Sequence, residues 1–149
     1  DEDLAYLGGF LDAEGSIGIS NQGSKDSNIY VCQVQLTNTG KEVMEKISNI
    51  YEELGVKSDL TVSERERDGY TGKEYYLNIQ RQDDVQAVLE TVKPYLIEKK
   101  ERAEIALEYI EHRKKKIEEN GGNRAGTYDG TEKEYYEKMK ELNQKRSKA

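Results

Sequence analysis

The first residues of the chain carry apolar side chains on two sides of a helix. Over residues 3–13, apolar side chains recur at helical spacing along two stripes, which contain Leu4, Leu7, Leu11, Tyr6, Phe10 and Ala13. This pattern predicts a short helix that is apolar nearly all round. A short helix of that kind must be buried.

Alternating patterns follow, and they are typical of β-strands. Residues 16–20 and 29–37 alternate apolar and polar side chains and are separated by a polar loop. Residues 60–67 and 74–80 alternate again and are joined by the turn-forming pair Asp68–Gly69. The chain therefore predicts two β-hairpins.

Helical patterns fill the rest of the chain. A helix is predicted over about 41–54, between the hairpins, and it should end at Gly55. Further helices are predicted over 83–92, 97–116 and 131–143.

The resulting order favours an α+β fold: one antiparallel sheet with helices on one face and the other face open. With 149 residues, we expect a single domain over 1–149. Its core should cover about 3–116, and a C-terminal loop and helix should occupy 117–149.

The composition excludes several classes of protein. No apolar stretch approaches the roughly 20 residues that a membrane-spanning helix needs. Cys32 is the only cysteine, so the sequence has no material for an intrachain disulfide or a thiolate zinc site. We expect no membrane association and an intracellular location in a reducing compartment, either cytoplasmic or organellar.

The charge balance bears on nucleic-acid binding. The net charge of −7 argues against it at first sight, because Lys and Arg supply most of the affinity for phosphates. Residues 93–149, however, contain 15 Lys or Arg against 12 Asp or Glu. Basic side chains that could contact phosphates are Arg113, Lys114, Lys115, Lys116, Lys138, Lys140, Lys145, Arg146 and Lys148. Taken alone, these runs are more typical of solvated helix ends.

Two acidic residues stand at an unfavourable place. Asp12 and Glu14 precede Gly15 at the end of the first predicted helix, where the helix dipole is negative. Each exposed carboxylate there costs about 0.3–1 kcal/mol. One reading is local: Asp12 binds nearby backbone donors and Glu14 points to water. The other is a site that holds a cation.

The string Leu7–Gly15, LGGFLDAEG, resembles the LAGLIDADG motif of homing endonucleases. The agreeing positions are Leu7, Gly9, Asp12, Ala13 and Gly15. The segment Pro94–Lys100 is also similar to the Pro-aromatic-Leu stretch of that family, with a Lys entering the next helix. The resemblance implies an αββαββα fold over about residues 3–110.

One motif in the chain implies a homodimer, because motif helices pack in pairs in this family. The resemblance places the dimer interface on Leu7, Gly9, Phe10, Asp12 and Ala13. The small residues Gly9 and Ala13 would allow close approach of two helices. The alternative is that they pack against the sheet of their own chain.

The same resemblance implies a metal-dependent site at the meeting point of the two helices. Glu14 from each protomer matches the acidic residue that binds Mg²⁺, and Mn²⁺ or Ca²⁺ could occupy the same site. The backbone carbonyl of Ala13 is a further candidate ligand. Lys99 matches a basic residue near the scissile phosphate, and Asn38 a polar residue that organises solvent. Taken alone, Lys99 is more typical of a solvated charge, and Asn38 is more typical of a helix cap. The sequence also departs from the family at Glu42, where a basic residue is common.

The open sheet face is predicted to read the bases of DNA. Alternation places polar side chains on it from all four strands: Ser20, Gln22, Gln33, Gln35, Thr61, Ser63, Arg65, Arg67, Tyr76, Asn78 and Gln80. Gln and Asn can pair with adenine and Arg with guanine in the major groove. Without the motif, a solvated sheet face explains the pattern equally well.

Together, the residues and the resemblance imply a homing endonuclease. It would cut both strands of a long pseudo-palindromic double-stranded DNA site and leave 3′ overhangs, with no small-molecule substrate. Two alternatives stay open: an RNA maturase that assists intron splicing, and a catalytically silent DNA-binding regulator.

Overall fold

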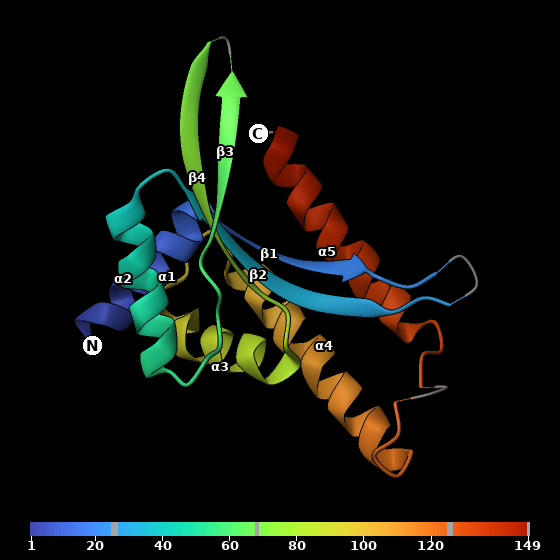
Figure 1. Ribbon diagram of the computed structural model, residues 1–149. Helices are drawn as coiled ribbons and strands as arrows, with labels where there is room; N and C mark the ends of the chain where they lie inside the picture. The colour runs from blue at the N-terminus through green and yellow to red at the C-terminus, as the bar shows by residue number, and fades with distance from the viewer. Residues whose placement is uncertain (25–26, 68, 125–126, 149) are drawn as a thin grey trace.

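The computed structural model describes residues 1–24, 27–67, 69–124 and 127–148 (Figure 1). The elements follow in the order α1 (Glu2–Glu14), β1 (Gly15–Asn21), β2 (Tyr30–Asn38), α2 (Lys41–Glu53), β3 (Thr61–Arg67), β4 (Tyr70–Ile79), α3 (Gln82–Val92), the 3₁₀ helix η1 (Lys93–Tyr95), α4 (Lys100–Glu119) and α5 (Thr131–Lys148). The predicted αββαββα order is confirmed. The side chains of Arg65, Arg67, Tyr70 and residues 145–148 lie outside the described part of the chain.

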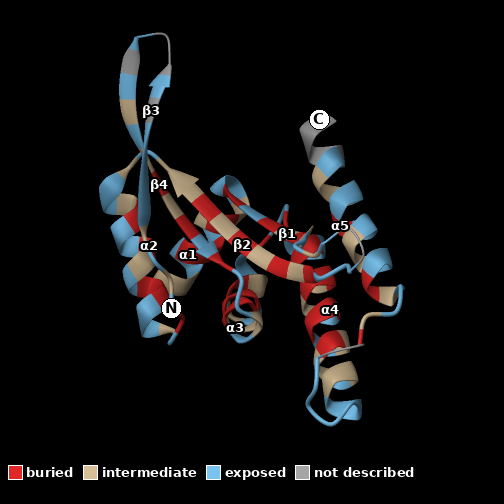
Figure 2. Cartoon of the chain, turned by 45° about the vertical axis from the view of Figure 1, so that its right-hand side comes forward, coloured by how far each residue is buried: buried red, intermediate tan, exposed pale blue. Residues whose placement is uncertain are grey.

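A four-stranded antiparallel sheet of order β1-β2-β4-β3 forms the centre of the molecule. Helices α1 to α4 lie on one side of this sheet, and α5 runs beside β1 (Figures 1 and 2). The outer part of the β3–β4 hairpin projects beyond the helices (Figure 1). The predicted α+β architecture, with helices on one face, is therefore confirmed.

The strand register separates the two sheet faces as the alternation predicts. Ile17 pairs with Val34, and Leu36 pairs with both Gly15 and Leu77. The side chains of Ile17, Val34, Leu36 and Leu77 are fully buried against the helices. The polar side chains between them consequently project from the opposite face.

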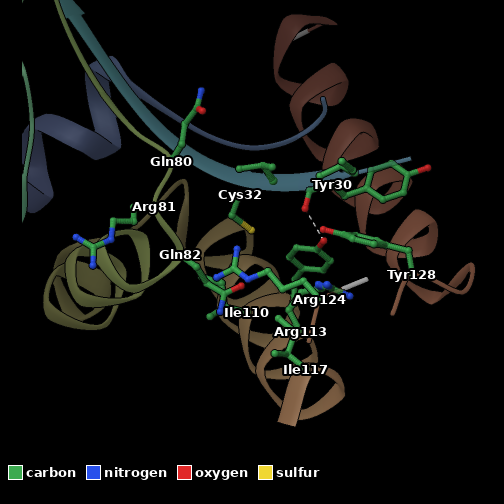
Figure 3. Close-up of a pocket in the computed structure, with 13 residues that line it drawn as sticks. Tyr30, Cys32, Gln80, Arg81, Gln82, Ile110, Arg113, Ile117, Arg124 and Tyr128 are labelled. Carbon is green, nitrogen blue, oxygen red and sulfur yellow. Dashed lines mark hydrogen bonds between the residues drawn. The ribbon is translucent and has the colours of Figure 1, made fainter. Parts of the chain in front are cut away.

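The core continues under the start of β2. The Tyr109 hydroxyl donates a hydrogen bond to the Tyr30 carbonyl over 2.6 Å, beside a cavity of about 350 Å³ (Figure 3). Cys32 is buried here, and burial raises the pKa of its thiol to about 12. The thiol is thus part of the packed interior.

Helix α1 differs from the expectation that it must be buried. Leu7, Gly8 and Leu11 are buried, but Tyr6 is 43% exposed and Phe10 is only partly covered. The prediction is wrong for the single chain because the second apolar stripe faces away from the core. That stripe needs another partner if it is to be covered.

Two helix boundaries show how glycines and distant contacts set the ends. Gly55, with φ +76°, follows the last turn of α2, as predicted. Helix α4 begins at Lys100 rather than at Ile97.

Among the described residues, no helix is both long and apolar enough to cross a membrane.

Candidate functional site

Gly15 carries the chain directly from α1 into β1 and so fixes the position of Glu14. A Cβ atom on Gly15 would lie 2.4 Å from Leu11 Cδ1 and 2.6 Å from Leu36 Cδ2, so a larger residue would force these two buried side chains to shift. Glu14 is consequently the last residue of the helix, and its side chain is exposed at the negative end of the helix dipole.

Asp12 binds a turn that lies far away in the sequence. Its carboxylate accepts backbone N–H bonds from Ile97 at 3.2 Å, Glu98 at 3.3 Å and Lys99 at 2.9 Å. Burial alone would raise the pKa of Asp12, but these three donors and the charge of Lys99 lower it overall. The prediction that Asp12 binds backbone donors is confirmed, but the donors are distant in the sequence rather than local.

Lys99 is buried rather than solvated. Its side chain is 1% exposed, and Nζ donates to the backbone carbonyl of Asp12. The reading of Lys99 as a solvated charge is therefore wrong, because its ammonium group meets the negative end of α1. The Asp12 carboxylate accepts the backbone N–H of Lys99, and the Lys99 ammonium group donates to the backbone carbonyl of Asp12. Asp12 lies two residues before Glu14 in the chain.

Asn38 is the last residue of β2 and does not cap α2. Its Oδ1 accepts the Gly40 N–H over 2.7 Å, and Gly40 is the residue at the N-cap. The helix-cap reading is wrong in this detail. In the strand register, Asn38 pairs with the buried Tyr75 of β4. Leu36, two residues before Asn38 in β2, pairs with Gly15, the residue that follows α1. Asn38 thus lies near the end of α1, while its catalytic role stays a prediction.

The open face of the sheet, called the reading face below, carries the predicted polar residues. Their backbone pairing sets Gln35 beside Asn78 and Thr61 beside Tyr76. The described side chains on this face are exposed or partly exposed: Ser20, Gln22, Gln33, Gln35, Thr61, Ser63, Tyr76, Asn78 and Gln80. Arg65 and Arg67 have paired backbones, but their side chains lie outside the described part of the chain.

Hydrogen bonds connect four of these side chains across strands. Gln22 Nε2 donates to Ser20 Oγ at 3.3 Å and to Gln80 Oε1 at 3.2 Å. Gln80 Nε2 donates to Gln33 Oε1 at 3.3 Å. The chain of amides orients donors and acceptors on an exposed surface, where base edges could replace them as partners.

Comparison with known proteins gives this arrangement its context. A family model described as a LAGLIDADG-like domain matches residues 1–93. The chain belongs to this LAGLIDADG-like family. A comparison of the sequence with curated proteins found no match.

Solved LAGLIDADG structures share the fold along nearly the whole chain. The homing endonuclease I-CvuI, in complex with a DNA target in the presence of Mg, matches with a TM-score of 0.60 and 20% identity over 95% of each chain. The archaeal intron-encoded endonuclease I-Vdi141I, complexed with DNA, matches with a TM-score of 0.53 and 19% identity over 97% of this chain and 99% of that one. I-GzeII, in complex with its DNA target, has a TM-score of 0.59 and 19% identity, and the match covers 93% of this chain but 43% of that one. The chain therefore corresponds in length to single-domain endonucleases.

The motif helix presents a small-residue surface to the outside. Gly9 and Ala13 are exposed, and a Cβ atom on Gly9 would meet nothing within 4 Å. Packing of Gly9 against its own sheet is therefore excluded. Leu7 is fully buried in the core of its own chain, and the Asp12 carboxylate is engaged within the chain. The predicted interface accordingly rests on Gly9, Phe10 and Ala13.

The donor atoms at the end of α1 suit a divalent cation. The Glu14 carboxylate and the nearby helix-end carbonyl of Ala13 are hard oxygen ligands of the type that Mg²⁺ prefers. Among the described residues of one chain, no group of three or more His, Cys, Asp or Glu side chains could hold a metal.

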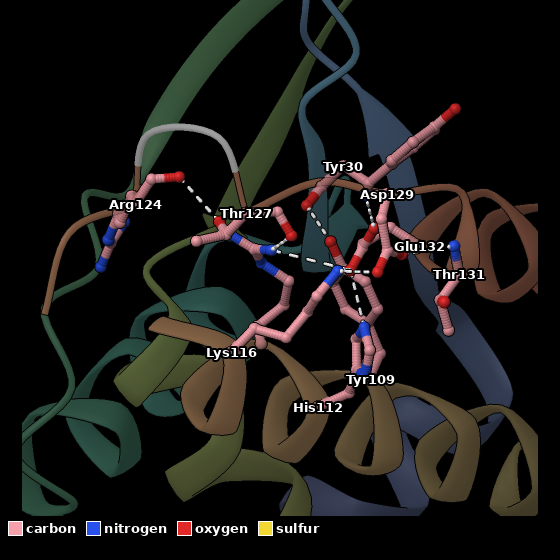
Figure 4. Close-up of polar contacts among 10 residues, drawn as sticks. Tyr30, Tyr109, His112, Lys116, Arg124, Thr127, Asp129, Thr131 and Glu132 are labelled. Carbon is pink, nitrogen blue, oxygen red and sulfur yellow. Dashed lines mark hydrogen bonds and ion pairs between the residues drawn. The ribbon is translucent and has the colours of Figure 1, made fainter. Parts of the chain in front are cut away.

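A buried polar cluster between α4 and α5 was missed by the sequence patterns (Figure 4). Glu132 is fully buried and lies 2.6 Å from His112, 3.0 Å from Lys116 and 3.7 Å from Arg113. His112 is partly buried, and the interpretation of Arg113 and Lys116 as solvated is wrong. The one signal in the sequence was that Glu132 is an acidic residue in the first turn of α5.

Proposed function

We propose that this LAGLIDADG chain is a homodimeric, Mg²⁺-dependent homing endonuclease that makes double-strand breaks in a long pseudo-palindromic DNA site and leaves 3′ overhangs. The observation that carries the proposal is the end of α1, where Glu14 is exposed and the buried Lys99 ammonium group binds the carbonyl of Asp12, two residues before Glu14.

The two Glu14 carboxylates, one from each protomer, would hold the cation together with the Ala13 carbonyls and phosphate oxygens. A bound divalent cation polarises the phosphoryl oxygen, makes water a stronger nucleophile and offsets the charge of the leaving group. Each chain contributes the rest. Asp12 fixes the 97–99 turn, and Lys99 keeps a positive charge at the end of α1, where it stabilises negative charge developing on the phosphate.

The reading face would supply the sequence preference. Its amide side chains Gln33, Gln35, Asn78 and Gln80 can each pair with adenine through one donor and one acceptor. Because the face is antiparallel sheet, the strands can follow the major groove. The predicted contacts also include the hydroxyls of Ser20, Thr61 and Ser63, the phenol of Tyr76, and the side chains of Gln22, Arg65 and Arg67.

The test uses the native protein and Glu14→Gln with a randomised duplex DNA library, with and without Mg²⁺. The native protein should cut a subset of sequences only when Mg²⁺ is present, and Glu14→Gln should bind those sequences without cutting them. Glu2→Gln, at the other end of the same helix, is the matched control because it removes the same charge, and it should cut normally.

Other outcomes distinguish the alternatives. Sequence-specific binding by the native protein without any nicking in Mg²⁺ would identify a silent DNA-binding regulator. Assistance to intron splicing that survives Glu14→Gln would identify an RNA maturase.

A further inference from the structure

A polar cleft runs along the β1 edge of the reading face. It encloses about 630 Å³ between β1 and α5. The residues that line it from the sheet are Ser16, Ile17, Gly18, Ile19, Ser20, Asn21 and Gln33. Because Ser20 and Gln33 also belong to the reading face, the cleft is continuous with that face.

Helix α5 forms the outer wall of the cleft and is fixed in place. Met139 is 1% exposed and packs into the core. Asn143 Nδ2 donates to the Ile17 carbonyl at 3.1 Å, which satisfies an acceptor on the free edge of β1. Arg102 donates to the Leu142 carbonyl at 3.0 Å. The wall is therefore held by the core, by the sheet edge and by α4.

The side of α5 that faces the cleft carries no acidic residue. It presents Tyr136, Met139, Lys140, Asn143 and Gln144 at helical spacing. The exposed acidic residues Glu134, Glu137 and Glu141 do not line the cleft. Among the described residues that do line it, Lys140 is the one charged side chain. In a chain of net charge −7, this side of the helix is thus locally positive.

Polar groups of the right chemistry for phosphate reach the rim of the cleft. Lys140, Gln144, Ser16 and Asn21 are exposed and offer an ammonium group, amide N–H groups and a hydroxyl. Such groups form most contacts with the sugar-phosphate backbone of DNA, and these contacts fix the register of a protein on the duplex. A duplex seated on the reading face would bring one backbone strand to this side.

We propose that the cleft between β1 and α5 receives the DNA backbone and that Lys140, supported by Gln144, contacts a phosphate there. This inference rests on the proposed binding of double-stranded DNA, and it assigns α5 the role of a side wall that positions the duplex. It also bears on how an acidic protein can hold a polyanion, because none of the acidic residues of α5 lines the cleft.

The experiment measures binding to a random-sequence DNA duplex in Ca²⁺ across a range of salt concentrations, because a phosphate contact does not depend on sequence. Loss of one phosphate contact should lower the slope of log affinity against log salt by about 0.9. We expect this decrease for Lys140→Ala. Lys138→Ala, which removes the same charge from an exposed position of the same helix outside the cleft, should keep the native slope. Thermal unfolding of both variants checks that each is folded.

The outcomes separate this inference from the proposed function. Equal slopes for all three proteins, or equal decreases for both variants, would overturn the assignment of Lys140 while leaving DNA binding in place. Failure of the native protein to bind any duplex would overturn the inference and the proposed function together. Since the assay measures binding, a lack of cleavage would bear on the nuclease proposal alone.

Discussion

At the scale of single residues, Asp12 and Lys99 hold the end of α1 against the 97–99 turn. The carboxylate accepts three backbone N–H bonds, and the ammonium group of Lys99 returns a bond to the Asp12 carbonyl. Asp12→Asn keeps Oδ1 but replaces Oδ2, the acceptor for Glu98, with an amide donor. We expect the unfolding free energy to fall by about 1–3 kcal/mol, the usual cost of an unsatisfied polar group.

The pH dependence of stability gives this prediction a second measurement. The pKa of Asp12 is lowered from its ordinary value of 3.8, so the stabilisation is fully present above that pH and is lost as the pH falls through the lowered folded value. The gap in unfolding free energy between the native protein and Asp12→Asn should be constant near neutral pH and shrink in acid. Urea titrations at several pH values measure it. Asp59→Asn, at an exposed loop position, is the control, and a gap independent of pH would contradict the role of the Asp12 charge.

At the scale of elements, the sequence predicts what is encoded locally. Gly55 ends α2 because a glycine accepts its positive φ, and the strands were predictable because apolar side chains alternate on them. The position of Glu14 follows from the motif and from Gly15. The start of α4 was not predictable, because the N–H groups of residues 97–99 bind a carboxylate 85 to 87 residues earlier.

Buried charges were the other feature that local patterns could not predict. Lys99 and His112 each occur in a polar run, and such runs are usually solvated. Their burial depends on partners that only the fold brings near, namely the Asp12 carbonyl for Lys99 and Glu132 for His112.

The attachment of α5 depends on Glu132, the buried partner of His112. Burial would raise the pKa of Glu132, but the Asp129 N–H, Lys116 and His112 lower it overall. Breaking a buried ion pair typically costs about 3–5 kcal/mol. Glu132→Gln should therefore destabilise the protein strongly and increase hydrogen exchange along α5. Glu134→Gln, on an exposed position of the same turn, should change little, and similar effects of the two variants in urea titrations would contradict a special role for Glu132.

At the scale of the whole molecule, α1 leaves an apolar surface without cover from its own chain. The rings of Tyr6 and Phe10 stack with centroids 6.4 Å apart, and Tyr6 is 43% exposed. Ile97, which follows the end of η1 and donates its N–H to Asp12, is 88% exposed. A contiguous exposed apolar surface such as the Tyr6–Phe10 pair typically marks an interaction site. A second copy of the chain, with its own α1, would match this surface in size and character.

The two glycines of the motif helix separate folding from association. A Cβ atom on Gly8 would lie 2.6 Å from Tyr95 Cβ, whereas one on Gly9 would meet nothing within 4 Å. Gly8→Ala should therefore destabilise the single chain. Gly9→Ala should stabilise it by about 0.5–1 kcal/mol through helix propensity.

If two α1 helices meet at Gly9, the methyl group of Gly9→Ala overpacks the interface at a cost of about 1–3 kcal/mol. A cost of about 1.4 kcal/mol weakens association tenfold. Sedimentation equilibrium combined with urea titration should thus find Gly9→Ala more stable as a chain yet more monomeric than the native protein. A Gly9→Ala protein that associates as tightly as the native one would show that α1 does not form the dimer interface, and with it the proposed pairing of the Glu14 carboxylates would fail.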